Sequence, residues 1–388
     1  AKLASSCARL YPEKNGKALC EIFGAYGWGE SVNEMLYLVN HMLVRGINAF
    51  IPHAYSQTFP NVDCPPHFGK NTTLFGGYKL IMQYMKKMCE LFAHEKADIK
   101  VAVLYHAEAE WSGKRYMPVD MVIKALFERQ IDCDILPSEK LEFADNYEYI
   151  IVPYAEFLPE KIVQKLKEVK GTKVVEITKN SGAEITKIAD KLPRTLCVSG
   201  KGAKRIRVMK FSDKDKFFLH NEGCETATVQ AKVGSKYIRA IDALTGGIEQ
   251  ITAENGQIML SLCAGQAVFM EYMSEIATVQ NGEKIRNIPF EKAGEDEMSI
   301  TYVVCAKFGE NERLIIDFSG EFARVKIGEI EQDFIGGIAV INGGKNVQNT
   351  TIKVYKNLAK TMRDDLSKFS VLRPARLNGI TVKNIEKG

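Results

Sequence analysis

The sequence predicts a multi-domain protein that combines α/β and all-β parts. Its 388 residues, 46% of them apolar, are too many for one ordinary core, and length alone suggests about two to four domains. Helices alternate with buried strands in the first half, and strands with a period of two follow. We therefore expect four units: 1–97, 98–198, 199–284 and 285–388.

The first unit, residues 1–97, reads as three helices separated by two strands. The apolar runs KALCEIF and INAFIPHAYS flank a helix that opens with Ser31 and Glu34, an S-x-x-E capping box. The last helix, 76–95, carries apolar residues at helical spacing. Strands in such a β-α-β-α pattern pair in parallel, and two of them are too few to close a sheet or a barrel.

The second unit, 98–198, has the pattern of a small doubly wound α/β domain. Four buried runs read as strands, with helices at about 118–129 and 159–169 between them. Pro159 fits the second of these helices, because a helix start tolerates proline. The four runs are IKVAVLY, IDCDILP, EYIIVPY and TKVVEIT.

The third and fourth units alternate apolar and polar residues, as half-buried strands do. Turn signals such as Thr245-Gly246-Gly247 separate the runs of the third unit. Both units are therefore predicted to be β-sandwiches. The expected strands are RIRVMKF, KFFLHNE, ATVQAKV, KYIRAID, GQIMLSL and QAVFMEYM in the third unit, and SITYVVCAKF, RLIIDFS, ARVKIG, GIAVING and TTIKVYKN in the fourth.

The charge pattern argues against nucleic acid and membrane partners. The 52 basic and 48 acidic residues nearly cancel, and the lysines are spread along the chain, so no basic footprint for nucleic acid is present. No apolar run approaches the roughly 18 residues that span a bilayer, and no signal peptide opens the chain. We expect a soluble protein with small or neutral partners.

The cysteines indicate a reducing compartment. Nine of them lie far apart, without a C-x-x-C motif, and we interpret them as reduced core residues. This favours a cytoplasmic location. The chain begins without Met inside a predicted helix, which we interpret as a processed or truncated product that has lost its targeting region.

The motifs predict no cofactor and leave a metal requirement undecided. GKGAKR lacks the strand-loop-helix context of a P-loop, and the glutamates in YHAEAEWSGKRYMP disfavour a phosphate or flavin site there. His53 and His67 have no evident third ligand, so a metal requirement stays open.

Two neighbouring strand ends carry the residues that could do chemistry. Parallel β/α enzymes place their sites beyond the carboxyl ends of the strands. The first strand presents a carboxylate and aromatic rings, and the second adds an amide, an imidazole and a phenol, a set that suits a sugar ring. A solvated loop carboxylate is an equally good interpretation of the acid from spacing alone. The candidates are Glu21 as the catalytic group, with Tyr26, Trp28, Asn48, His53 and Tyr55 as substrate-binding residues.

The stretch CEIFGAYGWGESVNEMLYLVNHMLVRGINAFIPHAYSQTFPNVDCPPHFG resembles the end of the catalytic (β/α)8 barrel in large bacterial glycoside hydrolases. It is similar to those related to family 2 and to the family 106 α-L-rhamnosidases, in which Glu-x-Phe-Gly-x-x-Gly-Trp precedes a helix, Arg-Gly-x-Asn and a His. The resemblance implies the C-terminal part of such a barrel in 1–97, a flavodoxin-like domain in 98–198 and a β-sandwich in 199–284.

The last unit, 285–388, resembles the jelly-roll, galactose-binding-like modules of the same enzymes. This chain has counterparts of three of their motifs: a V-x-x-N-G turn, a G-x-N element and a closing L-x-G-x-V. The spacer between the turn and the G-x-N element is shorter here, which disfavours a sugar-binding edge. The matching residues are Asn342, Gly343, Asn346, Leu377 and Gly379.

The resemblance implies hydrolysis of O-glycosidic bonds in a carbohydrate substrate by a pair of carboxylates. Glu21 would be the nucleophile of a retaining enzyme or the base of an inverting one. The partner belongs on an earlier barrel strand, so we expect it outside this chain, which alone should be weakly active or inactive.

A non-catalytic carbohydrate-binding or assembly module with a structural barrel remnant is the alternative, and a flavodoxin-like small-molecule binding protein is a third possibility. An incomplete barrel exposes apolar faces. We therefore expect the remnant either to pack onto the 98–198 unit or to form a homo-oligomer.

Overall fold

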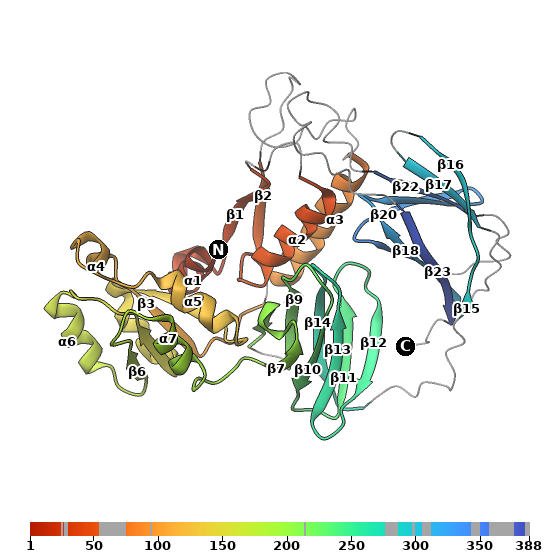
Figure 1. Ribbon diagram of the computed structural model, residues 1–388. Coiled ribbons are helices and arrows are strands. Elements are labelled where there is room, and N and C mark those ends of the chain that lie inside the picture. Colours follow the sequence, from red (N-terminus) through yellow and green to blue (C-terminus); the bar gives the residue numbers. More distant parts are fainter. Residues whose placement is uncertain are drawn as a thin grey trace, which may run out of the picture.

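The computed structural model describes most of the chain as an α/β part followed by a β-rich part (Figure 1). The multi-domain α/β plus β-rich architecture predicted from the sequence is thereby confirmed at this level. The described residues are 1–24, 26, 30–53, 75–93, 95–212, 215–275, 286–296, 299–304, 312–342, 350–356 and 376–384.

Two short strands near the N-terminus form a parallel pair. β1 (Leu19–Ile22) and β2 (Ala49–Pro52) run side by side with Glu21 opposite Ile51. The helix α2 (Val32–Leu43) connects them and α3 (Phe75–Phe92) follows. Successive strand residues face opposite sides, so Leu19 and Ile51, 54% and 52% exposed, share the open face with Glu21. This pair is too small to be a stable sheet by itself.

A four-stranded parallel sheet forms the second part, with strand order β4-β3-β5-β6. The four predicted apolar runs supply its strands. One face is covered by α5 (Val119–Phe127) and α7 (Gly182–Ala189), and the other by α6 (Glu160–Glu168) and the 3-10 segment Ser138–Asn146. The strands are β3 (Val101–Tyr105), β4 (Cys133–Pro137), β5 (Tyr149–Val152) and β6 (Lys173–Glu176).

The first helix, α1 (Lys2–Leu10), joins this parallel sheet to the β1–β2 pair. The buried Asp134 of β4 accepts a hydrogen bond from Ser6 Oγ at 2.9 Å and forms an ion pair with Arg9. Burial would raise the pKa of Asp134, but the charges of Arg9 and Lys2 outweigh it and hold this pKa below its usual value. The predicted unit 1–97 is thus tied to its neighbour through α1.

The third part is a sandwich of two antiparallel sheets, ordered β13-β10-β7 and β12-β11-β14-β9-β8. The six predicted strands are present. β7 and β12 were not predicted, and the expected boundary at 198/199 falls inside β7. The bounds are β7 (Cys197–Lys201), β8 (Ile206–Lys210), β9 (Lys216–Asn221), β10 (Ala227–Lys232), β11 (Tyr237–Asp242), β12 (Ile248–Thr252), β13 (Gln257–Leu262) and β14 (Ala267–Met273).

The five-stranded sheet of this sandwich also covers the apolar faces of α2 and α3 (Figure 1). Phe92 of α3 packs edge-on against Phe218 of β9, with ring centroids 5.1 Å apart. Because both faces of β9 are buried, its residues Phe217 to Asn221 are all buried and show no alternation. Of the segment 1–97, α1 packs onto the 98–198 unit, as one of the two expected arrangements requires, whereas the apolar faces of α2 and α3 pack onto the sandwich.

The last part also consists of two antiparallel sheets around one apolar core, ordered β15-β23-β18-β21 and β16-β17-β22-β19-β20. Asn342 ends β21, and Leu377 and Gly379 lie in β23, whereas Gly343 and Asn346 lie outside the described residues. The bounds are β15 (Arg286–Asn287), β16 (Glu291–Glu295), β17 (Ser299–Val304), β18 (Glu312–Ser319), β19 (Ala323–Ile327), β20 (Ile330–Phe334), β21 (Ile338–Asn342), β22 (Thr350–Tyr355) and β23 (Arg376–Asn384).

The interpretation of the cysteines as core residues is wrong for several of them. Cys133 is buried, but Cys197, Cys224 and Cys263 are exposed. The seven described cysteines are all free thiols, and Cys64 and Cys305 lie outside the described residues. In the part of the chain that the structure describes, no helix has the length and apolar content needed to cross a membrane.

The predicted capping box at the start of α2 is confirmed. Ser31 Oγ accepts from the Glu34 backbone N–H at 3.1 Å, and Glu34 Oε2 accepts from the Ser31 N–H at 2.8 Å. Glu321, from the turn after β18, accepts from the Val32 N–H at 2.7 Å and adds a second cap. The last sandwich therefore contributes to the stability of α2.

Ser31→Ala is expected to destabilise the protein by about 1 kcal/mol, because the Glu34 N–H loses its acceptor. The measurement is the free energy of unfolding of the transition that includes α2, by chemical denaturation. Ser181→Ala, which removes the equivalent cap of α7 on the parallel sheet, should leave that transition unchanged. An unchanged free energy in Ser31→Ala would mean that Glu321 alone caps the helix.

Candidate functional site

Glu21 and His53 lie together at the carboxyl ends of the two parallel strands. Glu21 is the third residue of β1, and His53 directly follows β2, where its backbone N–H donates to Ile22 O at 2.7 Å. His53 Nδ1 lies 2.5 Å from Glu21 Oε1. The Glu21 side chain is 64% exposed, and its Oε2 has no partner among the described residues. One carboxylate oxygen is thus oriented by the imidazole and the other faces solvent.

The backbone turns sharply directly after Glu21. Phe23 is fully buried in the core of α2 and α3 but has a φ of +73°, a conformation that bulky residues rarely adopt. The next residue, Gly24, lies beside His53, because an added Cβ would be in ordinary contact with the imidazole, 3.4 Å from its Cγ. The positive φ of Phe23 costs about 1–3 kcal/mol of backbone strain, which persists where the surrounding structure enforces it. The buried Phe23 side chain thus fixes the backbone at Gly24 beside the imidazole of His53.

The aromatic candidates are only partly described. The Tyr26 side chain is 53% exposed, as expected for a ring that is available for stacking. Trp28 and Tyr55 lie outside the described residues. Their positions relative to Glu21 therefore stay a prediction.

Asn48 lies at the other end of the strand pair from Glu21 and His53. It precedes β2, and its side chain accepts from the Ala18 N–H and donates to Gly16 O, both at 2.9 Å. The oxygen and the nitrogen of its amide group therefore both bond to the loop before β1. The structure does not bring Asn48 together with the other candidates.

Glu30, the residue directly before the capping box of α2, is a buried carboxyl group. It is 2% exposed, and neither carboxyl oxygen has a hydrogen-bond partner within the described part of the chain. Burial, with a further contribution from the charge of Glu34, raises the pKa of Glu30 to about 8. The group is therefore mostly protonated at neutral pH. A glutamate before a capping box gives no sequence signal of this, because its burial depends on tertiary packing.

Glu30→Gln is expected to remove a pH dependence of stability. A carboxyl group whose pKa is higher in the folded state binds more protons there, so stability falls as the pH rises from about 4.5 towards 8, by at most ~1.4 kcal/mol per pH unit. Glutamine resembles the protonated acid and does not ionise. The thermal midpoint of the variant, relative to wild type, should be higher at pH 8 than at pH 5. The same shift in the exposed control Glu13→Gln would contradict the assignment to Glu30.

Among the described residues, no group of three His, Cys, Asp or Glu side chains is placed to hold a metal ion. His67, considered with His53 as a possible ligand, lies outside the described residues.

Comparison with known proteins finds similarity at the level of structure. No protein-family model and no curated protein sequence matches this chain. The rhamnosidase from Novosphingobium sp. PP1Y superposes on 98% of this chain with a TM-score of 0.67 and 14% sequence identity, and the match covers 48% of its own chain. This chain therefore spans about half the length of that rhamnosidase.

Two β-galactosidases match over a smaller part of the chain. Gan42B, a GH42 β-galactosidase, has a TM-score of 0.49 and 13% identity over 66% of this chain and 54% of its own. The β-galactosidase from Bacillus circulans sp. alkalophilus has a TM-score of 0.46 and 14% identity over 62% and 52%. The match to the rhamnosidase, which extends over nearly the whole chain, shows that this chain shares the fold of the corresponding part of that protein.

Proposed function

We propose that residues 1–388 form part of a glycoside hydrolase that cleaves O-glycosidic bonds with a pair of carboxylates, one of which is Glu21. The observation that carries the proposal is the contact between Glu21 and His53, which come from adjacent parallel strands and meet at their carboxyl ends. The fold shared with a rhamnosidase supports it. The substrate class is carbohydrate.

The proposed architecture is the end of a (β/α)8 barrel, a flavodoxin-like domain and two β-sandwich modules. A barrel remnant would explain why β1 and β2 form an isolated parallel pair with exposed apolar side chains at Leu19 and Ile51. The order β4-β3-β5-β6 corresponds to 2-1-3-4 within its own domain, the flavodoxin-like order. The last module, 285–388, would be the jelly-roll, galactose-binding-like unit.

The chemistry assigned to Glu21 needs one oriented and one accessible oxygen. His53 holds Oε1, so Oε2 is left to attack the anomeric carbon in a retaining enzyme or to activate water in an inverting one. Tyr26, Trp28 and Tyr55 would stack on the C–H face of the sugar. Asn48 is left out of this proposal, because its side chain bonds to the loop at the opposite strand end.

The second carboxylate is proposed to come from outside this chain. Glu30 lies in the loop between β1, which carries Glu21, and α2, but at 2% exposure it cannot contact a substrate. The two carboxyl groups of a glycosidase lie about 5–5.5 Å apart for retention and 6.5–9.5 Å for inversion. Further parallel strands beside β1 and β2 would place an acid at such a distance.

The isolation of the β1–β2 pair favours a second candidate function. Among the described residues this pair has no further strand beside it, so the chain could serve as a carbohydrate-binding or assembly module without catalysis. The two functions differ in whether a longer polypeptide that contains these residues hydrolyses a glycoside.

The test compares residues 1–388 with the full product of the gene that encodes them. The assay substrates are 4-nitrophenyl α-L-rhamnopyranoside, suggested by the structural match, and 4-nitrophenyl β-D-galactopyranoside. The proposal expects turnover by the full product and little or none by residues 1–388 alone. A full product that binds sugar but hydrolyses neither these nor other aryl glycosides would support the non-catalytic module.

A further inference from the structure

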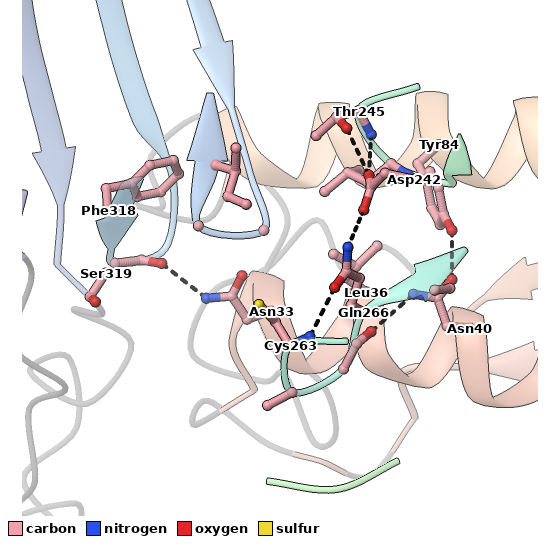
Figure 2. Close-up of a pocket in the computed structure, with 18 of the residues that line it drawn as sticks. Asn33, Leu36, Asn40, Tyr84, Asp242, Thr245, Cys263, Gln266, Phe318 and Ser319 are labelled. Carbon is pink, nitrogen blue, oxygen red and sulfur yellow. Dashed lines mark hydrogen bonds between the residues drawn. The ribbon is translucent and has the colours of Figure 1, made fainter. Parts of the chain in front are cut away.

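A cavity of about 480 Å³ lies away from Glu21 and His53, where the helices meet both sandwiches (Figure 2). Its walls come from one face of α2 and α3, from the turns after β11 and β13 in the first sandwich, and from the turns after β18 and β20 in the last one. Its volume falls within the range of about 300–1,000 Å³ that is typical of small-molecule sites. Neither Glu21 nor His53 lines it.

The polar side chains in the walls are held in place by bonds to one another. Gln266 donates to Asp242 Oδ2 at 2.7 Å and accepts from the Cys263 backbone N–H at 2.8 Å. Asp242 Oδ1 in turn accepts from Thr245 Oγ1 at 2.8 Å, and Figure 2 shows this chain of bonds along one wall. The polar groups are therefore oriented before any ligand enters, which lowers the cost of binding.

The side of the cavity formed by the helices offers acceptor oxygens. Asn33 donates through Nδ2 to Gly320 O at 2.9 Å, and its Oδ1 has no partner among the described residues. The Tyr84 hydroxyl donates to Asn40 Oδ1 at 2.6 Å and keeps its oxygen lone pairs free to accept. Hydroxyl groups of a ligand would be good donors to these oxygens.

The charge of the cavity walls restricts the charge that a ligand can carry. Two carboxylates, those of Asp242 and Glu321, line the cavity, and none of the described Lys, Arg or His residues does. An anionic ligand would therefore meet like charge at these walls. Leu36 and Phe318 provide apolar surface against which C–H groups can pack.

We propose that this cavity binds a neutral, hydroxyl-rich small molecule of mono- or disaccharide size, at a site separate from the one that contains Glu21. The inference depends on the geometry of the cavity and not on the proposed hydrolysis. If Glu21 has no catalytic role, the cavity is still expected to bind such a ligand.

Cys263 is a built-in reporter for this site, because its exposed thiol lines the cavity. A sugar at ten times its Kd should slow the modification of Cys263 by N-ethylmaleimide about tenfold, since only the free protein reacts. Cys197, an exposed thiol of β7 that is not part of the cavity wall, should react at an unchanged rate. Site-resolved mass spectrometry gives both rates from one sample.

The first comparison tests ligand charge. D-Galactose, L-rhamnose and lactose are the neutral probes, and D-galacturonate is the anionic partner of galactose. At least one neutral sugar should protect Cys263, and galacturonate should bind at least about fivefold more weakly than galactose, because it faces Asp242 and Glu321. Absence of protection by every mono- and disaccharide up to 100 mM, or preferential protection by galacturonate, would overturn the proposal.

The second comparison tests whether the sugar binds in this cavity. Ala264 is an exposed residue of the turn after β13 that lines the cavity, so Ala264→Phe should occupy its volume and abolish sugar binding measured by calorimetry. Ala183→Phe, on an exposed position of α7, controls for the added ring. Glu21→Gln should leave this binding unchanged. Binding that survives Ala264→Phe, in a variant with wild-type circular dichroism, or that is lost in Glu21→Gln would place the ligand elsewhere and contradict the proposal.

Discussion

Glu21→Gln is expected to lower kcat for glycoside hydrolysis by the full gene product by about 10²–10⁴-fold, the usual contribution of a positioned acid or base. Glutamine keeps the shape of the side chain and can still contact His53 Nδ1, but it carries no charge to stabilise or activate the reacting group. The Glu21 side chain is 64% exposed and has no buried partner to lose. Its replacement should therefore leave the thermal midpoint unchanged while activity falls.

The matched control is Glu13→Gln, an exposed glutamate in the short 3-10 turn Pro12–Lys14 before β1. It should retain wild-type kcat. If Glu21→Gln hydrolyses aryl glycosides at the wild-type rate, Glu21 is not a catalytic carboxylate. The configuration of the first sugar product, read by NMR, then separates the two possible roles of an essential Glu21: retention indicates a nucleophile and inversion a base.

Local rules explain which parts of the fold could be predicted from the sequence. The start of α2 follows from Ser31 and Glu34, because a capping box is satisfied by residues three apart. The strands β3 to β5 are apolar because both faces of the parallel sheet are covered by helices. The meeting of Glu21 and His53 follows from one further step, since the carboxyl ends of parallel strands lie at one edge.

The features that could not be predicted depend on contacts distant in sequence. β7 and β12 are polar edge strands, so little apolar pattern marks them. Asn48 follows an apolar residue and precedes an apolar run, which does not reveal that its amide binds the loop at residues 16–18. The burial of Glu30 and the cavity beside Asn33 arise only when separate parts of the chain pack together.

An ion cluster around Glu222 joins three parts of the chain. Glu222, directly after β9, is 7% exposed at its side chain. Its Oε1 lies 2.5 Å from Arg45 Nη1 and 2.8 Å from His41 Nδ1, both from the region of α2, and its Oε2 lies 2.7 Å from Arg207 Nε of β8. Arg207 also donates to the backbone oxygen of Phe127 at the end of α5. One carboxylate thus holds the helices, the first sandwich and the parallel-sheet domain together.

Glu222→Gln is expected to destabilise the protein by about 3–5 kcal/mol, because two largely buried guanidinium groups, those of Arg45 and Arg207, lose their ion-pair partner. The matched control is Glu225→Gln. Glu225 and its partner Lys201 are about three-quarters exposed, so its loss should change stability by less than about 1 kcal/mol. Chemical denaturation of the two variants and wild type at pH 7 gives the comparison. Equal stability of both variants would mean that the helical and apolar contacts hold the parts together without this cluster.

The same cluster sets a direction for the pH dependence of stability. Burial would raise the pKa of Glu222, but the bonds from His41 and Arg45 and the charge of Arg207 outweigh it and hold this pKa well below its usual value. A carboxylate with a depressed pKa stabilises the folded state above its unfolded pKa of about 4.5, and that contribution is lost as the pH falls through lower values. The difference in unfolding free energy between wild type and Glu222→Gln should therefore shrink when the pH is lowered from 5 to 3. A difference that stays constant over this range would show that the glutamine acts through packing and not through the lost charge.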